Sequence, residues 1–170
     1  DSPGIMHMIE QVRAQDTSGA VIGAGTVLDA QTARNAILAG ADFIFTPTLD
    51  LEVIEIANTY DKLVIPGVMT PTEMLTAYKA GAMMVKVFPA DVLGPEYIKA
   101  VKGPLFQIPV IPTGGIDLDN AASFIKAGAA AVGVGGSLLD KKAISSGNYQ
   151  VITERAREFI KVIAQARTGG

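Results

Sequence analysis

The sequence predicts an α/β protein of the (β/α)8 TIM barrel class. Short apolar runs of β type alternate with longer segments of helical spacing, and from Val21 onward this switch recurs about every 20 residues. Almost every apolar run also ends in glycine, proline or threonine. Because a barrel builds its site over the ends of all its strands, whereas an open doubly wound sheet has one switch point, these distributed endings favour a barrel.

Six apolar runs are expected to be strands. They are Val21–Val27, Phe43–Thr46, Leu63–Pro66, Met83–Phe88, Val110–Pro112 and Ala131–Val134. Their nearly continuous apolar character predicts parallel strands covered by helices. Ile5–Ala14 is expected to be a helix before the first strand, and Tyr149–Ala166 a final packing helix.

A weak internal repeat supports this order of elements. The triplet Ala-Gly-Ala occurs at 39–41, 80–82 and 127–129, each time between a helical segment and an apolar run. Glycine after a helix commonly adopts a left-handed conformation that ends it, so we interpret the triplets as helix termini in a repeating architecture.

Length and strand count together predict one barrel domain over residues 1–170 that is incomplete at its N-terminal side. A closed barrel of this type has eight strands, two more than the apolar runs supply. The first strand, first helix and second strand of the barrel are therefore expected to be absent from this chain.

Composition excludes several classes of function. The formal charge of −3 supplies no basic surface for nucleic acid. The chain has no cysteine, which excludes disulfides, thiolate nucleophiles and cysteine-bound metals. No apolar run has the length of a membrane helix, so the protein is expected to be soluble and cytoplasmic, without a membrane partner.

Lys86 is the leading candidate for a catalytic residue. Strand alternation within Met83–Phe88 places Lys86 on one face and Val85 and Val87 on the other, where valines suit packing under helices. A lysine that points into a barrel loses solvation, which lowers its pKa, and a neutral amine can attack a carbonyl to form an imine. The alternative is a lysine on a half-exposed edge strand whose ammonium reaches water.

Two glycine turns form a second constellation. Gly114 and Gly115 follow one strand, just before a helix expected near Asp119, and Gly135-Gly136-Ser137 follow the last strand. Glycines let backbone N–H groups approach an anion, and barrels commonly bind phosphate in their last two loops. The alternative is that these glycines only form tight turns and bind no ligand.

Threonine hydroxyls recur at the strand ends, where they could bind a small carboxylate or cap a helix or turn. They belong to Thr26, Thr46, Thr70 and Thr113.

Four segments together resemble the KDPG/KHG aldolases: 23–27 (GAGTV), 65–73 (IPGVMTPTE), 83–90 (MMVKVFPA) and 112–116 (PTGGI). The resemblance implies a class I aldolase on a (β/α)8 barrel, usually a homotrimer, working without metal or cofactor. It implies cleavage of 2-keto-3-deoxy-6-phosphogluconate to pyruvate and glyceraldehyde 3-phosphate, as in the Entner–Doudoroff pathway. Some members also cleave 4-hydroxy-2-oxoglutarate, a short 2-keto acid, to pyruvate and glyoxylate.

By the same resemblance, residues of this chain receive roles one by one. Lys86 is the Schiff-base lysine, and Thr26, Pro47 and Phe88 line the pyruvate end. The phosphate-binding positions are Gly114, Gly115, Gly136 and Ser137. The family's general acid/base, a glutamate after the second strand, is expected a few residues before Asp1.

Two rival readings stay open. One is a phosphate-binding barrel such as an epimerase or synthase that works without an imine, since the glycine turns would serve it equally well. The other is a non-catalytic, incomplete barrel that folds with a partner, because missing strands expose sheet edges.

Overall fold

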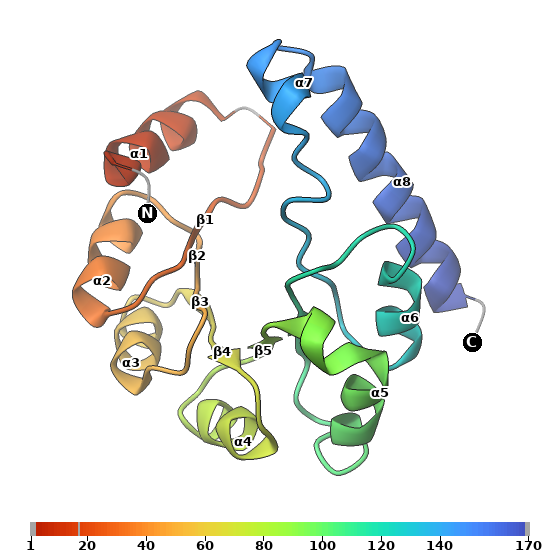
Figure 1. Ribbon diagram of the computed structural model, residues 1–170. Coiled ribbons are helices and arrows are strands. Elements are labelled where there is room, and N and C mark those ends of the chain that lie inside the picture. The colour runs from red at the N-terminus through yellow and green to blue at the C-terminus, as the bar shows by residue number, and fades with distance from the viewer. Residues whose placement is uncertain (1–2, 17, 169–170) are drawn as a thin grey trace. The chain divides into compact units, whose positions relative to one another are not determined.

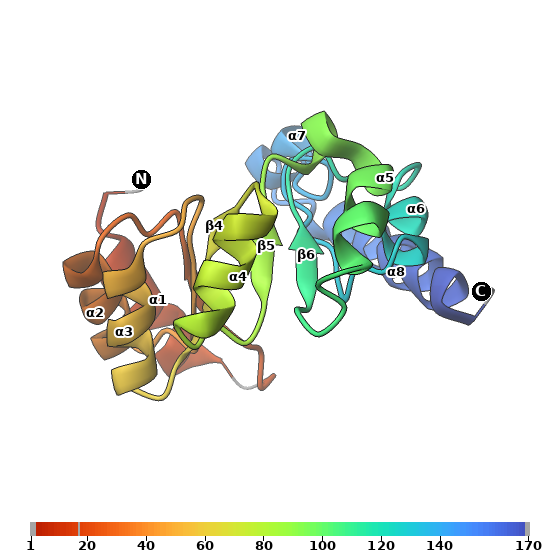
Figure 2. The ribbon, with the colours of Figure 1, turned by 90° about the horizontal axis from the view of Figure 1, so that it is seen from below.

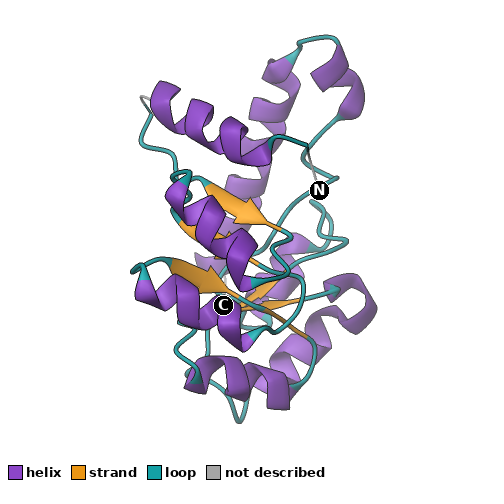
Figure 3. Ribbon diagram, turned by 90° about the vertical axis from the view of Figure 1, so that its left-hand side faces the viewer, coloured by secondary structure: helices purple, strands orange, loops and turns teal. Residues whose placement is uncertain are grey.

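Strands and helices alternate along the chain in the computed structural model, which describes residues 3–16 and 18–168. The chain forms two units, Asp1–Lys86 and Val87–Gly170, which are described separately. The α/β class and the parallel strands agree with the expectation from sequence. Figure 3 shows how short the strands are beside the helices.

The first unit is a parallel sheet with helices along it (Figure 1). Its elements are α1 (Ile5–Gln15), β1 (Gly23–Gly25), α2 (Ala30–Leu38), β2 (Phe43–Phe45), α3 (Leu51–Thr59), β3 (Leu63–Ile65), β4 (Gly67–Val68) and α4 (Pro71–Lys79). β1, β2 and β3 pair in sequence order, with Ala24, Ile44 and Val64 in one row. All three side chains in this row are buried. Strand β5 (Val85–Val87) begins in this unit, where the Lys86 N–H donates to the Pro66 carbonyl at 2.8 Å.

The second unit begins at Val87 and is mainly helical. It contains α5 (Ala90–Lys102), β6 (Val110–Pro112), α6 (Ala121–Lys126), α7 (Lys141–Ser145) and α8 (Tyr149–Thr168). Figure 2 shows α5 beside β6, and α6 packs against α8. The Thr113 N–H donates to the Val87 carbonyl at 2.9 Å, which ties the end of β6 to the end of β5. Among residues 3–16 and 18–168, no helix combines the length and the apolar composition of a membrane span.

One expected strand is wrong as an extended element. Ala131–Val134 forms only an isolated parallel bridge, between Gly133 and Thr113. The N–H groups of Ala130 and Gly133 do donate to the carbonyls of Val110 and Pro112, as in a parallel pair. In the described part of the chain, this segment pairs with the β6 segment on one side. Gly133 has no side chain that could pack against a neighbour, so the pairing does not extend into a regular strand.

The Ala-Gly-Ala triplets are helix termini, as interpreted from sequence. Gly40, Gly81 and Gly128 have φ near +100°, and each follows a helix. At the first of them the Gly40 and Ala41 N–H groups donate to the carbonyls of Ile37 and Ala36, the two bonds of a Schellman motif. Each helix therefore ends within one residue, and after the first two triplets the chain enters the next strand within a few residues.

Asp61 ends α3 in the same way without a glycine. Its φ is +53°, its N–H donates to the Asn58 carbonyl, and the Lys62 N–H donates to the Ala57 carbonyl. These are again the two bonds of the Schellman motif. An aspartate thus occupies the left-handed position that glycine occupies in the three triplets.

Candidate active site

Lys86 is buried, as are the two valines that flank it in β5. Its side chain is 7% exposed, while Val85 and Val87 are fully buried. The Lys86 Nζ lies 4.6 Å from the centroid of the Phe45 ring, and Phe45 is on the face of β2 opposite Ile44. An exposure of 7% does not fit a lysine on a half-exposed edge strand.

Burial lowers the pKa of Lys86 below its ordinary value of 10.5, because the charged ammonium loses hydration. The neighbouring Phe45 ring offers the ammonium only a weak cation–π attraction. Burial also lowers the pKa of Lys102, but the Lys102 Nζ donates to the carbonyls of Phe106 and Ile108 at 2.6 and 2.9 Å. Lys102 therefore closes the end of α5, whereas Lys86 lies in the core of the first unit.

The two other predicted residues of the first unit follow neighbouring strands. Thr26 follows β1 with φ of +58° and is exposed, and Pro47 follows β2. A Cβ on Gly67 would overlap the Pro47 backbone, so β4 approaches that turn closely. Thr46 supports the approach: its hydroxyl donates to the Thr48 carbonyl at 2.6 Å and accepts from the Gly67 N–H at 3.1 Å. Thr46 is thus a structural residue.

In the second unit, all five predicted residues line one cavity of about 350 Å³. They are Phe88, Gly114, Gly115, Gly136 and Ser137. The hydroxyl of Ser137 donates to the Ile116 carbonyl, which joins the two glycine turns. Gly114 and Gly115 have φ of +98° and +65°, so both are in a conformation that favours glycine. A Cβ on Gly115 would also overlap the Asp91 side chain.

The helix expected near Asp119 begins two residues later, so a turn separates it from Gly115. α6 starts at Ala121, and the intervening turn is held by Asp117, whose Oδ1 accepts from the N–H groups of Asp119 and Asn120 at 3.0 Å each. What the cavity offers an anion is therefore the backbone of the two turns, with glycines that allow close approach. The N-terminal end of α6 is not counted among the groups that would bind the anion.

The nearby acids have structural roles. Glu73 forms a capping box with Thr70 at the start of α4, and backbone N–H groups of Met69 and Thr70 donate to its carboxylate at 2.8 Å each. The bond from Met69 is the main cause that lowers the Glu73 pKa. Asp117 is committed to its own turn. Both acids thus already accept backbone hydrogen bonds.

Three residues around the candidate site were not identified from sequence. Phe45 lies beside Lys86. Asn120 donates from Nδ2 to the Gly115 carbonyl at 2.8 Å, and Arg155, on α8, donates to the Ser137 carbonyl at 3.1 Å. Strand alternation could have indicated Phe45, but nothing in local sequence pairs Arg155 with a residue 18 positions earlier.

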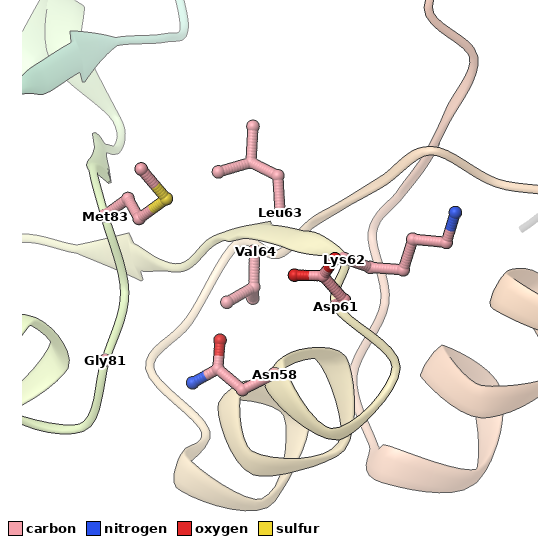
Figure 4. A pocket seen from close by; sticks show the side chains of 7 residues that line it. All are labelled: Asn58, Asp61, Lys62, Leu63, Val64, Gly81 and Met83. Atoms are coloured by element: carbon pink, nitrogen blue, oxygen red, sulfur yellow. The ribbon is translucent and has the colours of Figure 1, made fainter.

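A separate cavity of about 230 Å³ lies at the start of β3 in the first unit (Figure 4). It is lined by Asn58, Asp61, Lys62, Leu63, Val64, Gly81 and Met83, none of which is a predicted site residue. In Figure 4 the Lys62 ammonium points away from Asn58 and Val64. Asp61 and Lys62 belong to the turn that ends α3.

Comparison with known proteins identifies clear relatives. A family model described as KDPG and KHG aldolase matches residues 2–155. The 2-dehydro-3-deoxy-6-phosphogalactonate aldolase of Escherichia coli K12 is 38% identical over 148 residues, which cover 86% of this chain and 70% of the relative.

Solved structures give the same result. The native KDPGal structure has a TM-score of 0.90 at 35% identity, with 98% of this chain and 80% of that chain covered. The KDPG aldolase of Legionella pneumophila, with pyruvate captured as a covalent carbinolamine, has a TM-score of 0.83 at 28% identity, with 95% and 76% covered.

Proposed function

The chain belongs to the KDPG and KHG aldolase family, and from that premise we propose that it is a class I aldolase in which Lys86 forms the imine. The observation that carries the assignment is the burial of Lys86, which is 7% exposed and lies between two valines in the short strand β5. The pyruvate carbinolamine in the Legionella pneumophila relative supports covalent chemistry of this kind. The role of Lys86 in this chain is our proposal.

The reaction begins with attack of the neutral Lys86 amine on the C2 carbonyl of a 2-keto acid. The carbinolamine loses water to give a protonated imine, which withdraws electrons as the C3–C4 bond breaks. A base takes the proton of the C4 hydroxyl, and the aldehyde leaves. The enamine that remains is protonated at C3, and hydrolysis releases pyruvate and restores the amine. The resemblance assigns the proton transfers to a glutamate expected before Asp1.

The proposed substrate is 2-keto-3-deoxy-6-phosphogluconate, with 4-hydroxy-2-oxoglutarate as a second one. Thr26, Pro47 and Phe88 are proposed to bind the pyruvate part, and Gly114, Gly115, Gly136 and Ser137 the phosphate. The cavity that is lined by Gly114, Gly115, Gly136 and Ser137 together supports their shared role as phosphate positions. The relative named as a phosphogalactonate aldolase makes the C4 epimer the natural competitor in an assay.

The complete (β/α)8 barrel, the homotrimer, the cytoplasmic location and the place in the Entner–Doudoroff pathway are proposals from the resemblance. Parallel strands alternating with helices support the barrel, in which this chain would supply six of eight βα units.

Reductive trapping tests the proposal. Protein incubated with pyruvate and borohydride should carry a stable adduct on Lys86, located by peptide mass spectrometry. Lys102 is the matched control, because burial lowers its pKa too but its Nζ is bonded to two carbonyls. Lys86→Arg should abolish the adduct, since guanidinium keeps its proton.

An epimerase or synthase that works without an imine would leave Lys86 unmodified, as would a non-catalytic barrel. An unmodified Lys86 in protein with a cooperative thermal transition would therefore refute the proposed chemistry. Adducts spread equally over Lys86 and Lys102 would refute the specific role of Lys86.

A further inference from the structure

The Asn120 side chain does not cap the helix that follows it. Asn120 is the residue before α6, a place where asparagine usually bonds to the first turn of the helix, yet its side chain makes no such cap bond. It turns back instead. Its Nδ2 donates to the Gly115 carbonyl at 2.8 Å, and its Oδ1 accepts from the Asp117 N–H at 3.0 Å.

Both ends of this amide have fixed roles. A carbonyl only accepts and a backbone N–H only donates, so the orientation of the Asn120 amide follows from its two partners. The bonds are also reciprocal, because the Asn120 N–H donates to Asp117 Oδ1 at 3.0 Å. The turn from Gly115 to Asn120 is thus closed by three bonds that involve one residue.

These bonds determine which backbone groups the turn can offer to a ligand. The peptide unit is planar and trans, so holding the Gly115 carbonyl on Asn120 directs the Ile116 N–H to the opposite side of that peptide. Gly114 and Gly115, both at positive φ, are intrinsically permissive residues, so the bond to Asn120 restricts a backbone that could otherwise adopt several conformations. The opposite side of the turn is held by Ser137, whose hydroxyl donates to the Ile116 carbonyl.

Asn120 also helps to fix the position of the Asp117 carboxylate. Asp117 lines the same cavity, and a carboxylate free to move there would repel a phosphate dianion. The N–H groups of Asp119 and Asn120 hold this carboxylate on the turn. Loss of the Asn120 side chain removes the bond that keeps the Asp117 N–H in place and loosens this arrangement.

We propose that Asn120 is a positioning residue that makes the site selective for phosphorylated aldol substrates. It acts through the backbone of the Gly114–Asp117 turn and touches no reacting atom. The inference rests on the proposed function, because it assumes that this cavity binds the substrate phosphate. It adds a residue and a specificity role that the family resemblance did not supply.

The test compares two substrates in Asn120→Ala. KM for 2-keto-3-deoxy-6-phosphogluconate should rise about 10-fold, as expected for losing two hydrogen bonds that order the turn, while kcat changes by less than about 3-fold. For 4-hydroxy-2-oxoglutarate, which has no phosphate, kcat/KM should stay within about 2-fold of wild type. A general structural defect would lower activity on both substrates in parallel.

Asn58→Ala is the matched control. Asn58 also donates from its amide to a backbone carbonyl, that of Ala80 at 3.4 Å, but it lies in the first unit at the end of α3. The control should leave the ratio of the two kcat/KM values unchanged. Equal losses on both substrates in Asn120→Ala, or no change in KM for the phosphorylated one, would overturn the proposal.

Titration with inorganic phosphate separates this inference from the proposed function. Phosphate should shift the backbone amide NMR signals of Gly114, Gly115 and Gly136 in wild type, with at least about 5-fold weaker affinity in Asn120→Ala. Failure of pyruvate trapping alongside this phosphate result would refute the aldolase and leave Asn120 as an anion-positioning residue. Equal phosphate affinity in both proteins would overturn the role of Asn120 even in an active aldolase.

Discussion

At the scale of single residues, the chemistry depends on how strongly the surroundings of Lys86 disfavour a charge. The Lys86 side chain is buried, its Nζ lies over the ring of Phe45, and the strand residues on either side of it are valines. An aromatic face compensates an ammonium only in part for the water it has lost. The environment therefore favours the neutral amine, which is the nucleophilic form.

This environment predicts the pH dependence of imine formation. The pKa of Lys86 lies below 10.5, so the neutral fraction of Lys86 near neutral pH exceeds that of an exposed lysine. The initial rate of pyruvate trapping should rise with pH and level off above the lowered pKa, with a midpoint below 10.5. Trapping rates measured from about pH 5 to about pH 10 test this. A rate that still rises steeply, as for free N-acetyl-lysine, would contradict it.

Strand alternation predicts the face of the strand on which Lys86 lies, because the period of two is a property of the backbone alone. The same reasoning could not reach Asn120 or Arg155. Asn120 sits at a helix start, where the local preference is to cap, and the structure shows the amide turned to the preceding turn instead. Arg155 reaches Ser137 only through the packing of α8. Local sequence patterns therefore identify the candidate nucleophile, but they miss residues whose hydrogen bonds depend on tertiary packing.

At the scale of elements, the junctions between helices and strands set where each strand begins. The three Ala-Gly-Ala junctions were readable from sequence because glycine marks the left-handed position. The junction after α3 was not, because Asp61 occupies that position with φ of +53°. The expected strand at Ala131–Val134 failed for a different reason, since strand pairing depends on a partner and not on the apolar run alone.

The junction after α3 predicts a stabilising substitution. Asp61→Gly removes the steric cost of a Cβ at positive φ, although glycine also adds entropy to the unfolded chain, so we expect a net gain of about 0.5–1 kcal/mol in the free energy of unfolding. Urea denaturation measures it. Asp61→Ala is the control: it keeps the Cβ and loses the polar side chain that tolerates this conformation, so it should be less stable than wild type. A destabilised Asp61→Gly would contradict the prediction.

At the scale of the whole molecule, burying Lys86 lowers the free energy of unfolding. In the pH range between the lowered pKa of folded Lys86 and the ordinary pKa of 10.5 in the unfolded chain, the unfolded state binds more protons. The stability of the wild-type protein therefore rises with pH across that range. Below the range both states are protonated, and the full cost of burying the charge is present.

Replacing this lysine by an apolar residue of similar length should therefore stabilise the fold while abolishing trapping by pyruvate. Lys86→Met is expected to raise the free energy of unfolding at neutral pH by roughly 0.5–2 kcal/mol, since active-site residues commonly cost stability of this size and methionine packs well against Phe45. Because the stability of the wild type rises with pH between the lowered pKa of Lys86 and 10.5, the gain should shrink as pH approaches 10.5.

Urea denaturation of both proteins near pH 7 and near pH 10 measures this difference, with Lys161→Met on the exposed side of α8 as a control that should change stability by less than about 0.5 kcal/mol. A gain that stays constant with pH would mean that methionine packs better and that the charge is not the cause. A loss of stability at both pH values would mean that the ammonium is well compensated in the folded protein. Lys86 would then keep its proton at neutral pH, and the pH profile of trapping would have to shift upward in the same protein.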